Sequence, residues 1–281
     1  MAEGRFQGYA SPGEDFCRGS SRIDCNELRR LRPPYIDLPM KASTAAEFVP
    51  LGEGLRGYYA APATRAPALL LYQEIFGIND HIQDLCRRFA AAGYATIAPD
   101  FFGGKTFSYG GEDIEERKKA LFDDAFARHA IAAAIAFLDG RDDADATRLG
   151  AVGFCMGGRL AFLTAEVFAD RLRAAISFYG GGIGESRGPE RPALLDRVDA
   201  IRAPLLLAYG ANDKSIGPDE HARVAQALSA AGKRYTLDVY AGAGHAFMRD
   251  VGATYHEPSA REAWAAALSF FARHLGTERS A

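Results

Sequence analysis

A cysteine enclosed by glycines is the stretch of this chain whose composition most suggests chemistry. The segment GFCMG, residues 153–157, has the pattern G-x-S-x-G with cysteine in the place of serine. In that pattern the central residue lies in a strained turn between a strand and a helix, where close backbone contacts require glycine on both sides. The turn would present the sulfur of Cys155 above a sheet, and the helix N-terminus would favour the thiolate. The alternative is a buried cysteine in a glycine-rich turn that serves only close packing.

Other segments that could imitate this motif lack its context. The stretch GESRG matches G-x-S-x-G literally at Ser186, but no apolar strand precedes it and PERP follows where a helix should begin. A phosphate-binding loop is disfavoured because no Lys-Ser or Lys-Thr pair follows GFCMGG. The remaining cysteines, Cys17, Cys25 and Cys86, are expected to have no catalytic role, since two lie in a polar leader and the third on an apolar helix face.

A nucleophilic cysteine needs a base, and His245 is the histidine whose surroundings suit that role. It lies in the glycine turn GAGHAF directly after an apolar strand, whereas the other histidines lie at helix starts, within helices or in a polar loop. Asp213, in YGANDKSIGP, also follows a strand, although Asn-Asp serves equally well as turn chemistry. The order Cys155, Asp213, His245 is the nucleophile, acid, base order of α/β-hydrolases.

The segments before these residues predict the architecture that positions them. Short apolar strands alternate with helical segments, which indicates an α/β fold with a mostly parallel central sheet flanked by helices on both faces. Ligands of such sheets bind at the carboxyl ends of the strands. The first two predicted strands, divided by GEG, form an antiparallel hairpin. The predicted strands are EFVPL, LRGYYAAP, ALLLYQ, YATIAPD, RLGAVGF, AAISFYG, PLLLAYG and TLDVY; the predicted helices are DHIQDLCRRFAAAG, residues 113–139, MGGRLAFLTAEVF, HARVAQALSAAG and REAWAAALSFFARHL.

Length and charge set limits on the class of protein. The 281 residues suggest one large domain over 45–281, preceded by an irregular arm over 1–44 that is rich in Arg, Ser, Gly and Pro. The 33 basic and 36 acidic side chains are interspersed, so we expect no nucleic-acid partner. No apolar stretch approaches the ~20 residues of a membrane span, and the start of the chain lacks a signal-peptide core, so we expect no membrane association and a cytoplasmic location. The four cysteines have no metal-binding spacing, and no metal or organic cofactor is expected.

From about residue 46 to 275 the chain resembles the dienelactone hydrolase family, the carboxymethylenebutenolidase-like α/β-hydrolases. The resemblance implies that Cys155, Asp213 and His245 form a catalytic triad and that Glu74 is a fourth catalytic residue facing the thiol. A carboxylate there could take the thiol proton, while like charges would keep Glu74 and the thiolate from both being ionised. The motifs that carry the resemblance are YQEIFGIN (72–79), YATIAPDFF (94–102), GFCMGGR (153–159), YGANDKSIG (209–217) and GAGHAFMR (242–249).

The expected reaction follows from that assignment. The backbone N–H groups of Met156 and Ile75 would hold the oxyanion of a tetrahedral intermediate. Arg249 matches the family position that binds a substrate carboxylate, and a guanidinium suits that partner. Arg117 lies near the place of a second substrate-binding arginine of the family, but the local register does not align, so it is not assigned.

We therefore expect a hydrolase that cleaves an ester or lactone bond of a small, carboxylate-bearing substrate through a cysteine nucleophile and a thioester acyl-enzyme. One alternative is a broad-specificity carboxylesterase or thioesterase without lactone preference. Another is a non-catalytic binding or sensing protein that keeps the fold and the thiol. The sequence does not indicate an oligomeric state.

Overall fold

The structure is a computed structural model that describes residues 43–276. The predicted irregular arm over 1–44 therefore lies outside the described residues, apart from the two residues that begin the first strand. Nothing described tests the predicted boundary between the arm and the following domain.

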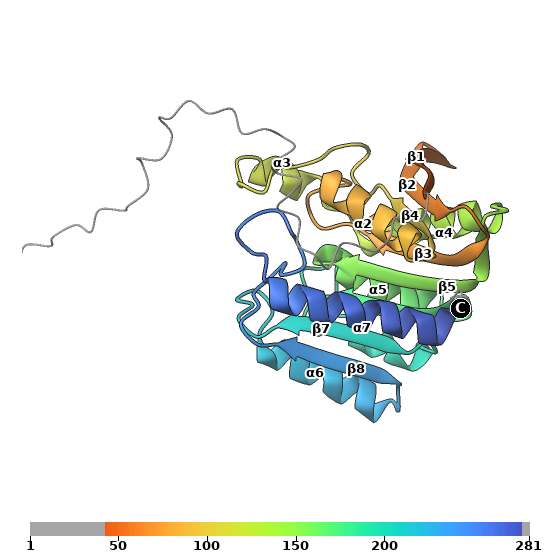
Figure 1. The fold of residues 1–281 in the computed structure, drawn as a ribbon. Helices are drawn as coiled ribbons and strands as arrows, with labels where there is room; N and C mark the ends of the chain where they lie inside the picture. Colours follow the sequence, from red (N-terminus) through yellow and green to blue (C-terminus); the bar gives the residue numbers. More distant parts are fainter. Residues whose placement is uncertain (1–42, 277–281) are drawn as a thin grey trace, which may run out of the picture. The chain divides into compact units, whose positions relative to one another are not determined.

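One eight-stranded sheet forms the centre of the described chain, with the order β1-β2-β4-β3-β5-β6-β7-β8. The hairpin of β1 and β2 is antiparallel, β2 pairs antiparallel with β4, and all pairings from β4 to β8 are parallel. In Figure 1 the arrowheads of β5, β7 and β8 point to the same side, toward the loops that follow them. The strands are β1 Ser43–Gly52, β2 Leu55–Pro62, β3 Ala66–Tyr72, β4 Ala95–Pro99, β5 Ala144–Phe154, β6 Leu172–Phe178, β7 Leu205–Gly210 and β8 Tyr235–Tyr240.

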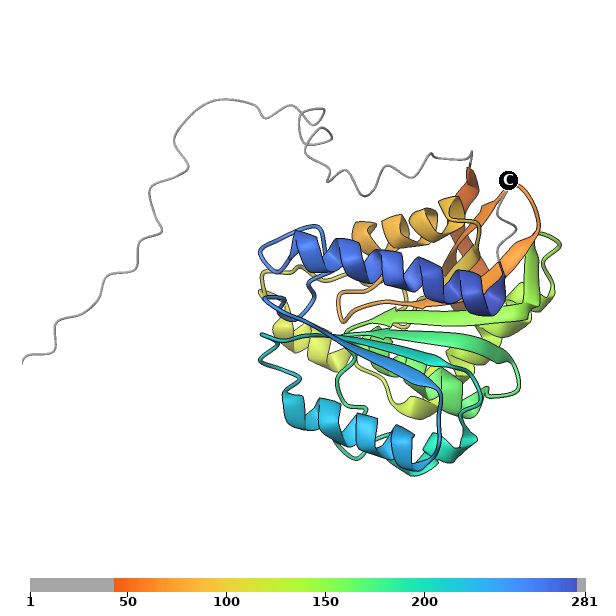
Figure 2. The same cartoon turned by 60° about the horizontal axis from the view of Figure 1, so that its bottom comes forward.

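Helices cover both faces of the sheet. Figures 1 and 2 show α2 and α7 together on one face and α4, α5 and α6 on the other. The helices are α2 Asp80–Ala91, α3 Ile114–Lys119, α4 Asp124–Asp139, α5 Met156–Val167, α6 Pro218–Ala230 and α7 Glu257–Leu275, with a 3-10 turn η2 at Leu195–Ala200. The predicted mostly parallel sheet between two helical layers is confirmed, as is the hairpin across GEG.

One predicted helix is too long. Residues 113–139 form two helices, α3 and α4, rather than one. Asp123 has extended backbone angles, and its side chain accepts a hydrogen bond of 2.7 Å from the N–H of Phe126. This is the geometry of an N-cap, so a new helix begins there.

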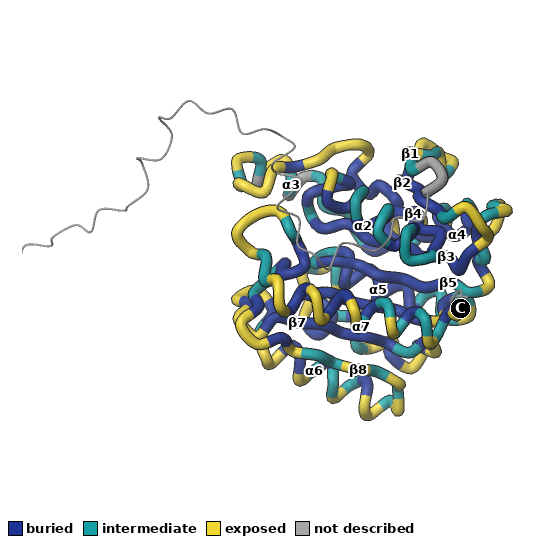
Figure 3. The backbone as a smooth tube through the Cα atoms, in the orientation of Figure 1, coloured by how far each residue is buried: buried dark blue, intermediate teal, exposed yellow. Residues whose placement is uncertain are grey.

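Burial explains why these segments form a sheet. Every residue of β3, β4 and β7 is buried, as expected for central strands covered on both faces (Figure 3). The outer strand β8 is only partly covered, and Val239 on it is exposed. Among the described residues, no helix is long and apolar enough to cross a membrane.

Candidate active site

The turn between β5 and α5 has the strained geometry predicted for a nucleophile. Cys155 adopts φ 56° and ψ −116°, a backbone conformation that residues with a Cβ rarely adopt. A Cβ on Gly153 would lie 1.8 Å from the carbonyl oxygen of Gly157, and one on Gly157 would lie 2.3 Å from that of Tyr72. The flanking glycines are therefore required by space, as the motif predicts. The thiol is free and only partly buried at the first turn of α5.

Asp213 and His245 meet at the same edge of the sheet, from the loops after β7 and β8. The Nδ1 of His245 lies 2.7 Å from Oδ2 of Asp213. The other carboxylate oxygen of Asp213 accepts the backbone N–H groups of Ser215, at 2.7 Å, and Ile216, at 3.2 Å. One oxygen of Asp213 thus stabilises its own turn, and the other lies against the imidazole of His245.

The protonation behaviour of His245 connects it to the thiol. Burial alone would lower its pKa, but hydrogen bonds to Asp213 and to Cys155 raise the pKa of His245 to about 10. Burial would raise the pKa of Asp213, but its bond to His245 and the two backbone N–H groups lower that pKa overall. The imidazole, paired with an ionised carboxylate at Nδ1, therefore has a proton available near neutral pH.

Glu74, just after β3, lies in the same cluster without a hydrogen bond. Its side chain is 2 % exposed, and neither carboxylate oxygen has a hydrogen-bond partner in the described structure. Nη1 of Arg249 lies 3.7 Å from Oε2 of Glu74. Burial raises the pKa of Glu74, and the charges of His81, Arg249 and His245 oppose that rise. A carboxyl group in this state is a stronger base than an ordinary glutamate.

The two amide groups expected to hold an oxyanion flank this cluster. Met156 is the first residue of α5, so its N–H has no acceptor within the helix. In the described part of the chain, the N–H of Ile75 donates to no other backbone carbonyl. Both amides belong to residues adjoining the side chains of interest, Met156 next to Cys155 and Ile75 next to Glu74.

Arg249 is held in the site by aromatic rings. Its guanidinium carbon lies 4.2 Å from the ring centre of Tyr109 and 5.4 Å from that of Phe76, and Nη2 donates to the hydroxyl of Thr254 at 2.9 Å. Arg117, on α3, lies 5.0 Å from the centre of the same Phe76 ring. The two arginines therefore share one aromatic neighbour. The sequence alone left Arg117 unassigned, because its local register does not align with the family.

Three residues of this region were not singled out by the sequence motifs. Tyr179, after β6, is fully buried, its hydroxyl has no hydrogen-bond partner among described atoms, and its ring centre lies 5.3 Å from that of His245. Nδ1 of His81 lies 3.3 Å from Oδ1 of Asp250. Tyr179 lies at the end of the predicted strand AAISFYG, which is a usable signal. The contact of His81 with Asp250 has no signal in the sequence.

Backbone strain is concentrated at this site. Among described residues other than glycine, φ is positive at Glu53 in the hairpin turn and at Cys155, Tyr179 and Ala246. The last three adjoin or carry the candidate catalytic groups. Strained backbone of this kind persists where the surroundings hold a functional side chain in place.

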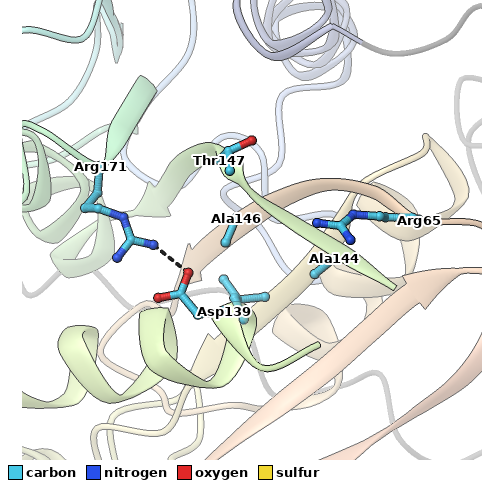
Figure 4. Close-up of a pocket in the computed structure, with 7 residues that line it drawn as sticks. Arg65, Asp139, Ala144, Ala146, Thr147 and Arg171 are labelled. Atoms are coloured by element: carbon cyan, nitrogen blue, oxygen red, sulfur yellow. Dashed lines mark hydrogen bonds and ion pairs between the residues drawn. The ribbon is translucent and has the colours of Figure 1, made fainter. Parts of the chain in front are cut away.

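The opposite edge of the sheet contains a hollow of about 360 Å3 (Figure 4). It is lined by the amino ends of strands, and the figure shows Arg171 paired with Asp139 at its rim, a contact of 2.6 Å. None of the candidate catalytic residues lines it.

Ser186, the residue of the literal G-x-S-x-G match, is exposed and bonds only to its own turn at Gly188. No group of three or more His, Cys, Asp or Glu side chains within residues 43–276 is arranged to hold a metal ion.

Comparisons with known proteins agree on the relatives of this chain. The sequence profile described as "Dienelactone hydrolase family" matches residues 55–275. A "Putative carboxymethylenebutenolidase" of Salmonella typhimurium is 34% identical over 259 residues, covering 88% of this chain and 93% of the relative. A "Probable 2-oxo-3-(5-oxofuran-2-ylidene)propanoate lactonase" of Bradyrhizobium is 31% identical over 241 residues, covering 82% and 93%. The crystal structure of a "Putative Dienelactone Hydrolase" from Klebsiella pneumoniae superposes with a TM-score of 0.74 at 34% identity, covering 83% of this chain and 100% of that chain. The fold is that of the α/β-hydrolases, as predicted.

Proposed function

This chain belongs to the dienelactone hydrolase family and is a carboxylic ester hydrolase, and we propose that it cleaves its ester or lactone substrate through Cys155 as nucleophile. The observation that carries the proposal is that the imidazole of His245 pairs with Asp213 at 2.7 Å and that Asp213 and Cys155 together raise its pKa against the effect of burial. An imidazole held in this way is the arrangement that nucleophilic catalysis by cysteine requires.

The first half of the reaction forms a thioester. The S–H bond of Cys155 breaks and its proton goes to the carboxylate of Glu74. The thiolate adds to the substrate carbonyl, and the N–H groups of Met156 and Ile75 stabilise the oxyanion, each contributing about 3 kcal/mol to the transition state. The C–O bond then breaks, and the leaving alkoxide takes its proton from the His245 imidazolium.

The second half releases the acid. Neutral His245 takes a proton from water, and the resulting hydroxide adds to the thioester carbonyl. The C–S bond breaks, the carboxylic acid departs, and Glu74 returns its proton to the thiolate. The sum is one ester and one water converted to one acid and one alcohol, and every protein group regains its starting state.

The substrate class follows from the charges that surround the sulfur. Arg249 is buried, faces Glu74, and its Nε has no hydrogen-bond partner in the described structure. A guanidinium with an unused donor suits a substrate that carries a carboxylate besides its ester bond. The lactonase relative from Bradyrhizobium, whose printed name describes a lactone with a carboxylate, supports that choice.

Turnover by a nucleophile variant tests the proposal. We expect Cys155→Ala to lose at least about 10⁴-fold in kcat on p-nitrophenyl acetate and on cis- and trans-dienelactone. Cys86→Ala, at a buried cysteine on α2, is the matched control and should keep its kcat. Full activity of Cys155→Ala would overturn the nucleophile. Wild-type turnover of the aryl ester without the dienelactones would favour a broad carboxylesterase or thioesterase, and an inert wild type would favour a binding or sensing protein.

A further inference from the structure

The loop after β6 is bound by a buried carboxylate from a helix that carries none of the candidate catalytic residues. Glu220, in the first turn of α6, is 2 % exposed. Its Oε1 accepts backbone N–H groups from three consecutive residues, Gly182 at 2.7 Å, Ile183 at 3.0 Å and Gly184 at 3.2 Å. Successive N–H groups that converge in this way form a backbone nest for an anion. One oxygen of Glu220 therefore fixes the backbone of all three residues.

A buried cation holds the same loop from the other side. Arg159, on α5, is 4 % exposed, and its Nε donates to the carbonyl of Gly182 at 3.1 Å. Its Nη2 donates to Oδ2 of Asp124 at 2.9 Å and to the carbonyl of Pro192 at 2.7 Å. Glu220 thus binds the N–H of Gly182 while Arg159 binds its carbonyl. Hydrogen bonds to charged groups that are shielded from water are stronger than neutral ones, so the loop is held firmly between α5 and α6.

This loop, residues 179–184, is named the bridging segment, and it packs against the turn that carries Cys155. The N–H of Cys155 donates at 3.0 Å to the carbonyl of Phe178, immediately before the segment. A Cβ added at Gly180 would lie 2.7 Å from the carbonyl carbon of Gly158, in the first turn of α5. Because backbone meets backbone there, a shift of the bridging segment would move the first turn of α5 and the sulfur with it.

The bridging segment also reaches the acid and the base of the site. A Cβ added at Gly181 would lie 3.0 Å from Cγ1 of Ile216, whose N–H donates to Asp213 at 3.2 Å. The ring centre of Tyr179 lies 5.3 Å from that of His245, in an edge-on arrangement. The bridging segment is therefore in contact with the supports of the nucleophile and of the acid, and with the base itself.

Strained backbone makes the bridging segment dependent on the groups that hold it. Tyr179 has φ 39° and Gly182 has φ 81°. A residue with a Cβ, such as Tyr179, rarely adopts a positive φ, and this conformation persists only where the surroundings impose it. The N–H of Tyr179 donates to the carbonyl of Ala208 at 2.7 Å, which fixes the start of the segment. Glu220 fixes its other end.

We propose that Glu220 is a positioning residue for catalysis, which binds three N–H groups of the bridging segment and so sets the placement of Cys155 relative to Asp213 and His245. The inference rests on the proposed function, in which these three side chains act together. The property that matters is an acceptor oxygen at the right distance from α6, rather than the negative charge. Misplacement of reacting groups by about 1 Å costs on the order of 10²-fold in rate.

Two other roles for Glu220 make different predictions. Its Oε2 lies 3.5 Å from Nη2 of Arg187, whose side chain is 40 % exposed. If this ion pair were the function of Glu220, an aspartate would preserve the charge and a glutamine would not, although exposed pairs of this kind are weak. If Glu220 only stabilised the fold, substitutions would lower the amount of folded enzyme, and each folded molecule would keep the wild-type rate.

The test compares Glu220→Gln with Glu220→Asp in the hydrolysis of p-nitrophenyl acetate. Circular dichroism and thermal unfolding give the folded fraction, to which kcat is referred. We expect Glu220→Gln to keep kcat within about threefold, because its amide oxygen accepts the same N–H groups. Glu220→Asp, shorter by one methylene, should lose about 30- to 100-fold in kcat. Its KM should change less than about threefold, because no contact with substrate is removed.

NMR titration of His245 is a second readout of the same two variants. Burial lowers the pKa of His245, but Asp213 and Cys155 raise it to about 10. This pKa should fall in Glu220→Asp, because the imidazole and its partners are no longer held in register, and it should be kept in Glu220→Gln. Wild-type kcat or an unchanged pKa of His245 in Glu220→Asp would overturn the proposal. A loss of kcat in Glu220→Gln as large as in Glu220→Asp would also overturn it.

The matched control is Glu166→Asp, the same shortening at another buried glutamate. Glu166, on α5, is 3 % exposed, and neither of its carboxylate oxygens has a hydrogen-bond partner in the described structure. Its kcat per folded molecule should stay within about twofold of the wild type, and a loss as large as that of Glu220→Asp would overturn the proposal. Failure of the proposed function would appear separately, as ester turnover that is retained in Cys155→Ala.

Discussion

Charged side chains lie at both edges of the central sheet, but they differ in burial and in hydrogen bonding. At the amino edge, around the hollow of Figure 4, charged side chains are partly exposed and paired: Asp145 accepts the N–H and hydroxyl of Thr147 and pairs with Arg148, and Asp139 pairs with Arg171. At the carboxyl edge, Glu74 is buried without a hydrogen bond. The charged groups of the amino edge are paired like those of an ordinary protein surface, whereas Glu74 at the carboxyl edge is left without a hydrogen bond, as suits a reactive group.

The difference teaches where this protein gives up stability. A buried polar group without a hydrogen bond costs about 1–3 kcal/mol. Such groups at the carboxyl edge include Glu74 and the hydroxyl of Tyr179, beside the strained backbone of Cys155. A fold that only needed to be stable would pair these groups as it does at the amino edge. The contrast can be tested with matched substitutions at the two edges.

The largest contrast is expected between two aspartates. Asp213→Asn should lower kcat by about 10³- to 10⁴-fold, because the imidazole loses the carboxylate that orients it. The pKa of His245 should fall from about 10, since the bond to Asp213 helps to raise it. Asp145→Asn, at the amino edge, should change kcat less than about twofold, since surface substitutions away from a site have small effects. Steady-state kinetics measure kcat in the two variants, and histidine NMR titration measures the pKa of His245. Equal losses of kcat in the two variants would contradict the comparison.

The next contrast concerns two arginines and is selective for substrate. Arg249→Ala should raise KM for a carboxylate-bearing lactone by about 10- to 100-fold, the value of a charge-assisted hydrogen bond of about 1.5–3 kcal/mol. Neutral p-nitrophenyl acetate should be affected far less. Arg171→Ala removes the arginine of an exposed pair and should leave both substrates unaffected. Equal losses on charged and neutral esters would assign Arg249 a structural role instead.

The smallest contrast is in stability, and its sign depends on pH. Because the pKa of Glu74 is raised in the folded state, its ionisation opposes folding increasingly as pH rises above the usual carboxyl value of about 4.5. Glu74→Gln should therefore raise the melting temperature at pH 8 by a few degrees, about 2–4 °C per kcal/mol, and the gain should shrink toward pH 4. Asp139→Asn at the amino edge should show no such gain. Thermal unfolding of the wild type and the variants at pH 8 and at pH 4 measures these differences. A melting temperature of Glu74→Gln below that of the wild type at pH 8 would contradict this account.

Most of the fold was predictable because its signals are local. Continuous apolar strands, glycine stops and the GFCMG turn each depend on neighbouring residues, and the structure has strands and a strained turn at those places. The break between α3 and α4 was missed because helical periodicity continues on both sides of Asp123, and a single cap is a weak signal against it.

The contacts within the site were less accessible from the sequence. The sequence places His81 at a helix start, and the structure has it in the first turn of α2. Only the folded chain brings the distant Asp250 to it. The orphan hydroxyl of Tyr179 and the shared ring of Phe76 between Arg117 and Arg249 depend in the same way on packing between distant segments. Residue types predict candidate roles, but tertiary contacts decide which charges act on one another.

The central claim is that substrate carbon becomes bonded to the sulfur of Cys155, and mass spectrometry of the enzyme during turnover tests it most directly. With a slowly hydrolysed ester and rapid acid quenching, we predict that the protein gains the mass of one acyl group and that the peptide containing Cys155 carries it. An acyl group found on another residue, or none while product forms at the full rate, would contradict the account.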